Sequence, residues 1–274
     1  MLTSAVWAVY RCNLCSVRVR NRFKAKLEAD DRQIGYWLSL ASPLATEAIS
    51  KVGFDWALID TEHSPTEIAG LVPLLQAAGN GTAHPIVRPA WNDAVLIKRI
   101  LDVGAQTLLI PFVQTGEEAR RAVAATRYPP NGVRGVAGAT RASNFGLDRS
   151  YLKEANDSIC CIVQIETSVA VGNVVEIAET PGVDAVFFGP SDLAASLGHL
   201  GDPEAKLVQH TLKENIGRLA RRGVKVGVMA TNPDVAQRYL EYGARFVSVG
   251  VDVTGLVANA SEGLSKSKKL LGVV

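Results

Sequence analysis

Two carboxylates and an imidazole lie at the end of one short apolar run of the chain. The run from Phe54 to Ile59 is followed by Asp60, Glu62 and His63. It is too short for a lone helix and is typical of a strand covered on both faces, as in a parallel sheet. Charge at the end of a buried strand serves chemistry more often than packing, so these three residues are candidate catalytic groups.

Other apolar runs also end in charged residues. The run that begins at His84 ends with Arg88, whose buried guanidinium would be costly without an anion to pair with. Glu166 and Asp192 each lie just beyond an apolar run. Facing carboxylates repel, and a divalent cation such as Mg²⁺ relieves that repulsion. The alternative is that both acids cap the helices that follow them.

The elements that must position these residues alternate regularly along the chain. Apolar runs span Ile34 to Ala41, Phe54 to Asp60, His84 to Pro89, Gln106 to Val113, Ile159 to Ile165, Ala185 to Gly189, Val224 to Ala230 and Phe246 to Gly250. Amphipathic stretches between them include Thr66 to Ala78, Asp93 to Asp102, Gly116 to Arg127, Ser168 to Glu179, Pro203 to Arg222 and Pro233 to Tyr242. Eight such units favour an α/β fold with a single (β/α)8 TIM barrel, whose active site lies at the carboxyl ends of the strands. A doubly wound sheet is the alternative, but no glycine-rich phosphate loop follows any strand.

Composition limits the class of protein. The chain has 274 residues, 47% of them hydrophobic and 20% charged, with a formal net charge of +2. This composition is ordinary for a globular protein, and the sequence shows no linker between domains. The near-neutral charge argues against a nucleic-acid partner, because proteins that bind nucleic acids usually carry a clustered basic excess. No apolar run is long enough for a membrane span. The adjacent Cys160 and Cys161 lie in an apolar run, which predicts buried thiols in a cytoplasmic protein.

The amino-terminal segment differs from the rest of the chain. It is basic, with no acid before Glu28. We interpret residues 1–21 as a poorly ordered extension and 22–274 as the barrel domain; an organelle-targeting or secretory leader is the alternative, and it lacks a clear cleavage site. Cys12 and Cys15 have the spacing of half a zinc site, but no second pair follows.

Several motifs occur in order along the chain and together are similar to one known family. They are Gly35 to Leu38, Asp60 to Pro65, Val87 to Asp93, Ile97 to Gly104, Arg127 to Pro130, Gly132 to Gly135, Gln164 to Thr167 and Gly189 to Leu193. They resemble the metal-dependent class II pyruvate aldolases of the HpcH/HpaI family over residues from about 22 to 265. The amino-terminal twenty residues fall outside the resemblance.

The resemblance implies a role for each matching residue. Glu166 and Asp192 would bind Mg²⁺, Mn²⁺ or Co²⁺, and Arg88 would contact the keto oxygen of the substrate and stabilise the enolate. His63, held with help from Asp102, would be the acid/base group, and Asp60 and Glu62 would organise that network. The substrate-binding residues would be Arg88, Gln164, Gly189, Pro190, Ser191 and Trp37.

The resemblance also implies an activity. It is the reversible cleavage of 4-hydroxy-2-oxo acids, with 4-hydroxy-2-oxoheptanedioate as the first candidate, to pyruvate and an aldehyde such as succinate semialdehyde. Cleavage leaves a pyruvate enolate whose oxygen a cation and an arginine can stabilise, while a histidine moves the proton. The alternatives are a 2-dehydro-3-deoxyglucarate-type sugar-acid aldolase and a 2-oxo-acid-binding protein without turnover. Relatives imply a homo-oligomer, a hexamer.

Other candidates carry less weight. A Schiff-base lysine is disfavoured because Lys225, the only lysine within the predicted strands, begins its strand at the wrong face. We interpret His84 and His210 as structural or solvated, whereas His199 could line the mouth. Trp37 and Trp91 either line the pocket or pack in the protein core. The long insertion from Tyr128 to Gly146 carries Arg134 and Arg141, which we hypothesise to meet the distal carboxylate of a dicarboxylic substrate.

Overall fold

The computed structural model describes residues 21–273, which form a closed barrel of eight parallel strands. The strands are β1 (Gln33–Leu38), β2 (Trp56–Asp60), β3 (His84–Arg88), β4 (Thr107–Ile110), β5 (Cys160–Ile165), β6 (Ala185–Phe188), β7 (Val226–Val228) and β8 (Phe246–Val251). Each pairs with the next in order, and β8 closes onto β1. The predicted (β/α)8 barrel is confirmed, and the doubly wound alternative is wrong. The predicted extension, with Cys12 and Cys15, lies outside the described residues except for Asn21.

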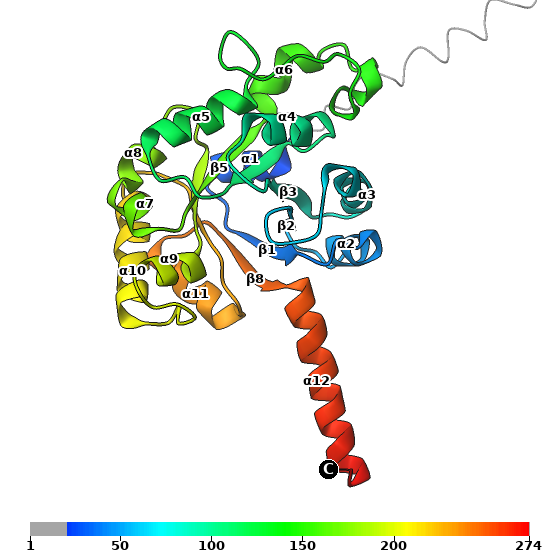
Figure 1. Ribbon diagram of the computed structural model, residues 1–274, viewed down its shortest axis with the longest axis vertical. Helices are drawn as coiled ribbons and strands as arrows, with labels where there is room; N and C mark the ends of the chain where they lie inside the picture. Colours follow the sequence, from blue (N-terminus) through cyan, green and yellow to red (C-terminus); the bar gives the residue numbers. More distant parts are fainter. Residues whose placement is uncertain (1–20, 274) are drawn as a thin grey trace, which may run out of the picture.

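Helices follow the strands and surround most of the barrel (Figure 1). They are α1 (Arg22–Glu28), α2 (Pro43–Ser50), α3 (Ile68–Ala78), α4 (Ala94–Asp102), α5 (Gly116–Thr126), the 3-10 helix η2 (Arg141–Gly146), α6 (Tyr151–Ser158), α7 (Ser168–Gly172), α8 (Val174–Ala178), α9 (Pro190–Ser196), α10 (Lys206–Ala220), α11 (Pro233–Tyr242) and α12 (Asp252–Leu271). The one helix predicted from Ser168 to Glu179 is two helices, which meet at Asn173. None of the helices within residues 21–273 is both long and apolar enough to span a bilayer.

Large side chains fill the barrel interior. Trp56, Phe187 and Phe246 pack edge-on or tilted against one another, with ring centroids 5.7 to 6.5 Å apart. Phe23 from α1 closes the amino end, 5.2 Å from the Phe246 ring. Gly35 lies directly against the Trp56 ring, where an added Cβ would collide with the indole. The barrel is therefore a packed core, and its open end is the carboxyl end.

Polar residues after the strands begin several of the helices. Asp93 accepts hydrogen bonds from Val95 and Leu96 at the start of α4, and Thr115 accepts one from Glu118 at the start of α5. These side chains satisfy amides that have no partner within the helix. The caps set short loops at the carboxyl ends of β3 and β4, which hold the mouth in place.

The last helix departs from the barrel pattern. The α12 helix extends away from the barrel rather than packing along it (Figure 1), and Asp252 is its one buried residue among those described. The Asp252 carboxylate accepts hydrogen bonds from the amides of Ser39 and Leu40, which anchors the start of α12 to the end of β1. The rest of α12 exposes apolar side chains, among them Leu256 at 61% and Leu264 at 59%.

Candidate active site

Asp60 and Arg88 form a buried ion pair at the carboxyl end of the barrel. They are register partners on the neighbouring strands β2 and β3. Arg88 Nε donates to Asp60 Oδ1 at 2.9 Å and Nη2 donates to Oδ2 at 2.7 Å, a bidentate geometry. The anion that the sequence required for Arg88 is thus supplied by the protein itself.

Glu62 and Trp37 complete the surroundings of this pair. Glu62 Oε2 lies 2.9 Å from Arg88 Nη1, and the Arg88 guanidinium lies 4.9 Å from the centre of the Trp37 ring. Trp37 Nε1 donates to Asp60 Oδ2 at 3.2 Å. Trp37 is 5% exposed, so it packs on the ion pair and orients it. The structure brings Asp60, Glu62, Arg88 and Trp37 together.

Burial and the ion pair shift the titration of these groups in different directions. Burial raises the pKa of Asp60, but the hydrogen bonds and the charge of Arg88 outweigh it and lower that pKa below its ordinary value. Burial alone would lower the pKa of Arg88, but the hydrogen bonds and the charge of Asp60 outweigh burial, so the pKa of Arg88 is raised. Burial raises the pKa of Glu62. Asp60 and Arg88 are therefore a fixed pair of charges, and Glu62 is the more readily protonated neighbour.

His63 lies on the loop after β2 with its side chain 67% exposed. Its backbone amide donates to Asp60 Oδ1 at 3.4 Å, and Nε2 lies 4.0 Å from Glu62 Oε1. The backbone is thus tied to the ion pair, while the imidazole is exposed beside Glu62 at the carboxyl end of the barrel. The role of His63 in proton transfer stays a prediction.

Glu166 follows β5, which is separated by β4 from the strand that carries Arg88, and it is 3% exposed. Its Oε1 accepts from the Phe112 amide at 2.7 Å, and its Oε2 accepts from Gln164 Nε2 at 2.6 Å. Burial raises the pKa of Glu166 to about 7; the charges of Asp192 and Glu62 also raise it, whereas the Phe112 amide and Arg88 oppose the rise. No cation of the chain is bound to this carboxylate among the described contacts, which distinguishes it from Asp60.

The β6–α9 turn lies against Glu166. An added Cβ at Gly189 would come within 2.9 Å of both Gln164 Nε2 and Glu166 Oε2, so a larger residue would displace these two groups. The Gly189 amide donates to the carbonyl of Ile165, and proline has no N–H, so of the predicted residues Gly189, Pro190 and Ser191 only Ser191 can offer an amide to a substrate. Asp192 is exposed in the first turn of α9.

The oxygen atoms at the carboxyl end of β5 and in the first turn of α9 are suited to bind a cation. Among the described residues Gln164 Oε1 is buried without a hydrogen-bond partner, burial raises the pKa of Glu166, and Asp192 adds a second acid. Oxygen donors of this kind, one or two of them carboxylates, are what Mg²⁺ binds in proteins. No group of three or more His, Cys, Asp or Glu side chains poised for a metal occurs in the described part of the chain. A cation here would therefore keep positions for substrate or water.

Asp102 and His63 do not meet within one chain. His63 follows β2 at the carboxyl end, whereas Asp102 is the last residue of α4, which returns to the amino end before β4. Asp102 Oδ1 accepts instead from Arg134 Nη2 at 2.7 Å. The role of Asp102 beside His63 stays a prediction, and it would require Asp102 from a second copy of the chain.

The two arginines of the long insertion also lie away from the mouth. The Arg134 side chain is fully buried between Tyr128 and Tyr151, with Nε and Nη1 unpartnered. Arg141 Nη1 donates to the carbonyl of Val103, just after α4, at 2.8 Å. The insertion folds back to the end of α4, so these arginines do not reach the mouth of their own chain, and their contact with a distal carboxylate stays a prediction.

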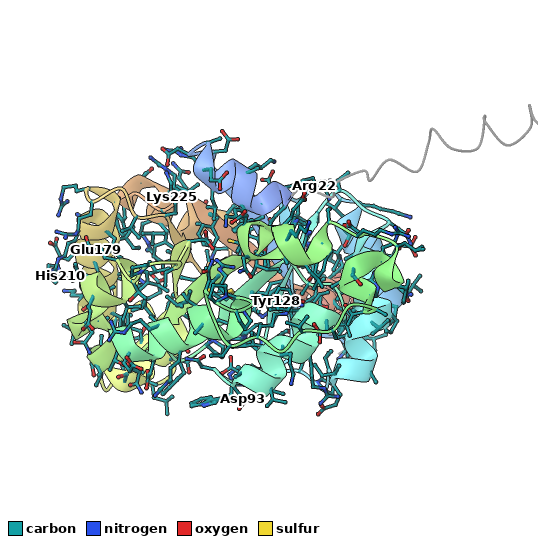
Figure 2. All side chains as sticks on the ribbon, turned by 90° about the horizontal axis from the view of Figure 1, so that it is seen from above. Arg22, Asp93, Tyr128, Glu179, His210 and Lys225 are labelled. Carbon is teal, nitrogen blue, oxygen red and sulfur yellow. The ribbon has the colours of Figure 1, made fainter. Side chains whose placement is uncertain are left out.

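Lys225 and two of the remaining histidines have structural surroundings. Lys225 precedes β7, pairs with Asp30, and lies on the opposite side of the molecule from Asp93, which begins α4 at the mouth (Figure 2). The His84 ring contacts Thr107 Oγ1 at 2.9 Å, and burial lowers the pKa of His84 to about 3. His210 is exposed on α10 (Figure 2). The position of His199 at the mouth stays a prediction.

Phe112 is the site residue that sequence reasoning missed. It has a φ of +56°, a left-handed conformation that is uncommon for a residue other than glycine, and this conformation directs its amide at Glu166. Its ring stacks on Trp91 at a centroid distance of 5.5 Å. The only signal in the sequence was its place near the end of the predicted run from Gln106 to Val113, because nothing local encodes a positive φ for phenylalanine.

Known proteins match this chain over nearly all of the barrel. The pattern of the HpcH/HpaI aldolase/citrate lyase family matches residues 33–260. The chain belongs to this family. A 4-hydroxy-2-oxo-heptane-1,7-dioate aldolase of Escherichia coli is 48% identical over 248 residues, covering 90% of this chain and 94% of that protein. The same named enzyme of Salmonella arizonae is 48% identical over 259 residues, covering 93% and 98%.

A solved structure of the family is also similar. The HpcH/HpaI aldolase/citrate lyase family protein of Burkholderia cenocepacia J2315 has a TM-score of 0.88 and 40% identity, covering 90% of this chain and 99% of its own. Because the match spans both sides of the mouth, it includes the Asp60 to Arg88 side and the Glu166 to Asp192 side of the site.

Proposed function

We propose that the protein is a divalent-metal-dependent pyruvate aldolase that reversibly cleaves 4-hydroxy-2-oxo acids, 4-hydroxy-2-oxoheptanedioate first among them, to pyruvate and an aldehyde. The observation that carries the proposal is the pair of unlike buried carboxylates at one barrel mouth. Asp60 is neutralised by Arg88, whereas Glu166 is bound to no cation among the described residues. Family membership and the aldolases at 48% identity support the same activity.

Arg88 is suited to hold the developing enolate oxygen. A guanidinium has five N–H groups, and Asp60 accepts hydrogen bonds from two of them, while Glu62 forms an ion pair with Nη1. The remaining N–H groups are available to the keto oxygen of a 2-oxo acid. Because Asp60 and Trp37 already fix the guanidinium plane, these donors need little reorganisation as negative charge develops.

Glu166 and Asp192, with Gln164 beside them, would hold the metal, which we propose to be Mg²⁺, Mn²⁺ or Co²⁺. When bound, such an ion supplies Lewis-acid stabilisation of negative charge on the substrate oxygens. The Phe112 amide and Gln164 orient the two oxygens of Glu166, and Ser191 can offer its amide to the substrate carboxylate.

His63 would move the proton. During cleavage a base removes the proton of the C4 hydroxyl as the bond between C3 and C4 breaks, the electron pair staying on C3 as the enolate. An imidazole accepts and returns a proton near neutral pH. The imidazole is exposed beside Glu62, which contacts Arg88, and the backbone of His63 is held by Asp60, so we propose that the ring acts on a substrate bound at Arg88.

We propose that the enzyme acts as a homo-oligomer, a hexamer, in the cytoplasm. The exposed α12 helix carries Leu256, Val257 and Leu264, which a second copy can cover. An oligomer would also let Asp102 of one copy approach His63 of another, since only one Asp102 oxygen is used by Arg134. The free, buried Cys160 and Cys161 suit a reducing compartment.

The test is release of pyruvate from 4-hydroxy-2-oxoheptanedioate by chelator-treated protein resupplied with each metal. We expect metal-dependent release, and a loss of at least about 10²-fold in Arg88→Ala, the scale for removing an oxyanion donor. Arg88→Lys is the matched control, because it keeps the charge and loses the planar fork. Faster release from hydroxylated substrates would favour the sugar-acid alternative. Pyruvate binding without turnover would contradict the proposal.

A further inference from the structure

An aromatic pair borders the mouth between its two sides. Trp91 lies on the loop after β3 and Phe112 on the loop after β4, and their rings stack with centroids 5.5 Å apart at 30°. Trp91 is 53% exposed. About half of the Trp91 side chain is exposed at the carboxyl end of the barrel, so its apolar surface is available to contact a ligand.

The pair lies beside the reacting groups. The β4 strand separates β3, which carries Arg88, from β5, which leads into Glu166. The Phe112 amide donates to Glu166 Oε1 at 2.7 Å, so the main chain that carries this ring touches the proposed metal ligand. A substrate held between Arg88 and Glu166 must therefore pass close to the Phe112 and Trp91 side of the rim.

The loop that carries Trp91 is held in place. The Asp93 amide donates to the Trp91 carbonyl at 2.9 Å, and the Asp93 side chain caps α4. Asn92 Nδ2 donates to the carbonyl of Glu118 at 3.1 Å, which ties the same loop to α5. A ring on a loop fixed at these points presents a preformed surface, which binds apolar groups at low entropic cost.

Apart from this pair, the described mouth loops carry no Phe, Trp or Tyr and no Lys or Arg. The segments that follow β1 to β7 are residues 39–42, 61–67, 89–93, 111–115, 166–167, 189 and 229–232, all within the described part of the chain. Trp91 and Phe112 are the only Phe, Trp or Tyr residues in these segments, and none of them contains Lys or Arg. These loops contain no Lys or Arg to pair with an anionic substituent of the aldehyde, whereas an apolar substituent can pack against Trp91 and Phe112.

We infer that Trp91 and Phe112 form the aldehyde-side wall of the site and select aldehydes whose carbon chain next to the carbonyl is apolar. A carboxylate further along the aldehyde would be met outside these loops. The inference rests on the proposed aldolase function and identifies the substrate class of that site.

The test compares addition of pyruvate to propanal and to glycolaldehyde, which differ only in a methyl in place of a hydroxyl. We expect the kcat/KM ratio of propanal to glycolaldehyde to fall about three- to tenfold in Trp91→Ala, the range of an aromatic contact. The ratio cancels any general loss of activity. Trp91→Phe is the matched control and should keep most of the preference, because it retains a ring that can stack on Phe112.

A second variant separates the ring of Phe112 from its backbone. Phe112→Gly permits the left-handed conformation without strain, so the amide can still donate to Glu166. We expect the same fall in the ratio. An unchanged ratio in both Trp91→Ala and Phe112→Gly, with pyruvate methyl protons still exchanging with D₂O, overturns the inference alone. Absence of that exchange in the wild type with every metal overturns the proposed function and this inference together.

Discussion

On one side of the barrel mouth Asp60 lies against Arg88, and on the other side Glu166 lies against a backbone amide and the amide of Gln164. Both carboxylates are almost completely buried, yet the pKa of Asp60 is lowered and that of Glu166 is raised to about 7. Neutral donors offset less of the cost of burying a charge than a guanidinium does. We propose that the β5 side of the mouth binds a divalent cation, because no cation from the described residues is bound to Glu166 there.

Removing the carboxylate of Asp60 is the change with the largest expected effect. Asp60→Ala leaves the Arg88 charge buried with Glu62 as its remaining anion, and breaking a buried pair in this way costs about 3–5 kcal/mol of the free energy of unfolding. Urea unfolding measures it. The control is Asp30→Ala, because Asp30 pairs with Lys225 and Arg245 on the exposed amino end and should matter far less. Equal losses in the two variants would contradict the comparison.

The Glu166 side predicts an opposite dependence of stability on pH. In metal-free protein Glu166 keeps its proton up to about pH 7, whereas the unfolded chain releases it near 4.5. The folded state binds more protons between these values, so the free energy of unfolding from this group falls as pH rises through that window, by up to about 3 kcal/mol. Urea unfolding with chelator at pH 5 and pH 8 measures it. Glu166→Gln should flatten the change, and an unflattened profile would contradict the assignment.

Bound metal should remove most of the loss of unfolding free energy that ionised Glu166 causes at high pH. A divalent cation binds the ionised carboxylate, so added Mn²⁺ should raise the unfolding midpoint more at pH 8 than at pH 5. The same addition to Glu166→Gln should give a much smaller rise at pH 8. Equal stabilisation at both pH values would place the ion elsewhere.

Asp102 offers the smallest effect, and it tests the contact between copies. Mixing inactive Arg88→Ala chains with inactive Asp102→Asn chains by co-expression should restore part of the activity. A copy with intact Arg88 could then receive Asp102 from its neighbour. Each variant expressed alone is the control. No recovery in assembled mixtures would show that Asp102 does not act across copies.

The sequence predicted what depends on strand order. Apolar runs located the strands, and their ends located Asp60, Arg88 and Glu166, because parallel strands of a barrel end at one face. It could not place Arg134 and Arg141, since the path of a long insertion depends on contacts with α4 that are distant in sequence. It also missed the positive φ of Phe112, which tertiary contacts impose. The link from Asp102 to His63 failed within one chain because α4 carries Asp102 to the opposite end.

The most direct measurement is exchange of pyruvate methyl protons with D₂O, followed by NMR, on chelator-treated protein resupplied with Mn²⁺ or Mg²⁺. It isolates enolate formation from the choice of aldehyde. We predict exchange that depends on metal, disappears in Glu166→Gln and falls strongly in Arg88→Ala. Exchange that persists in Glu166→Gln, or that is absent from the wild type with every metal, would contradict the account of a mouth that pairs one carboxylate with arginine and the other with a metal ion.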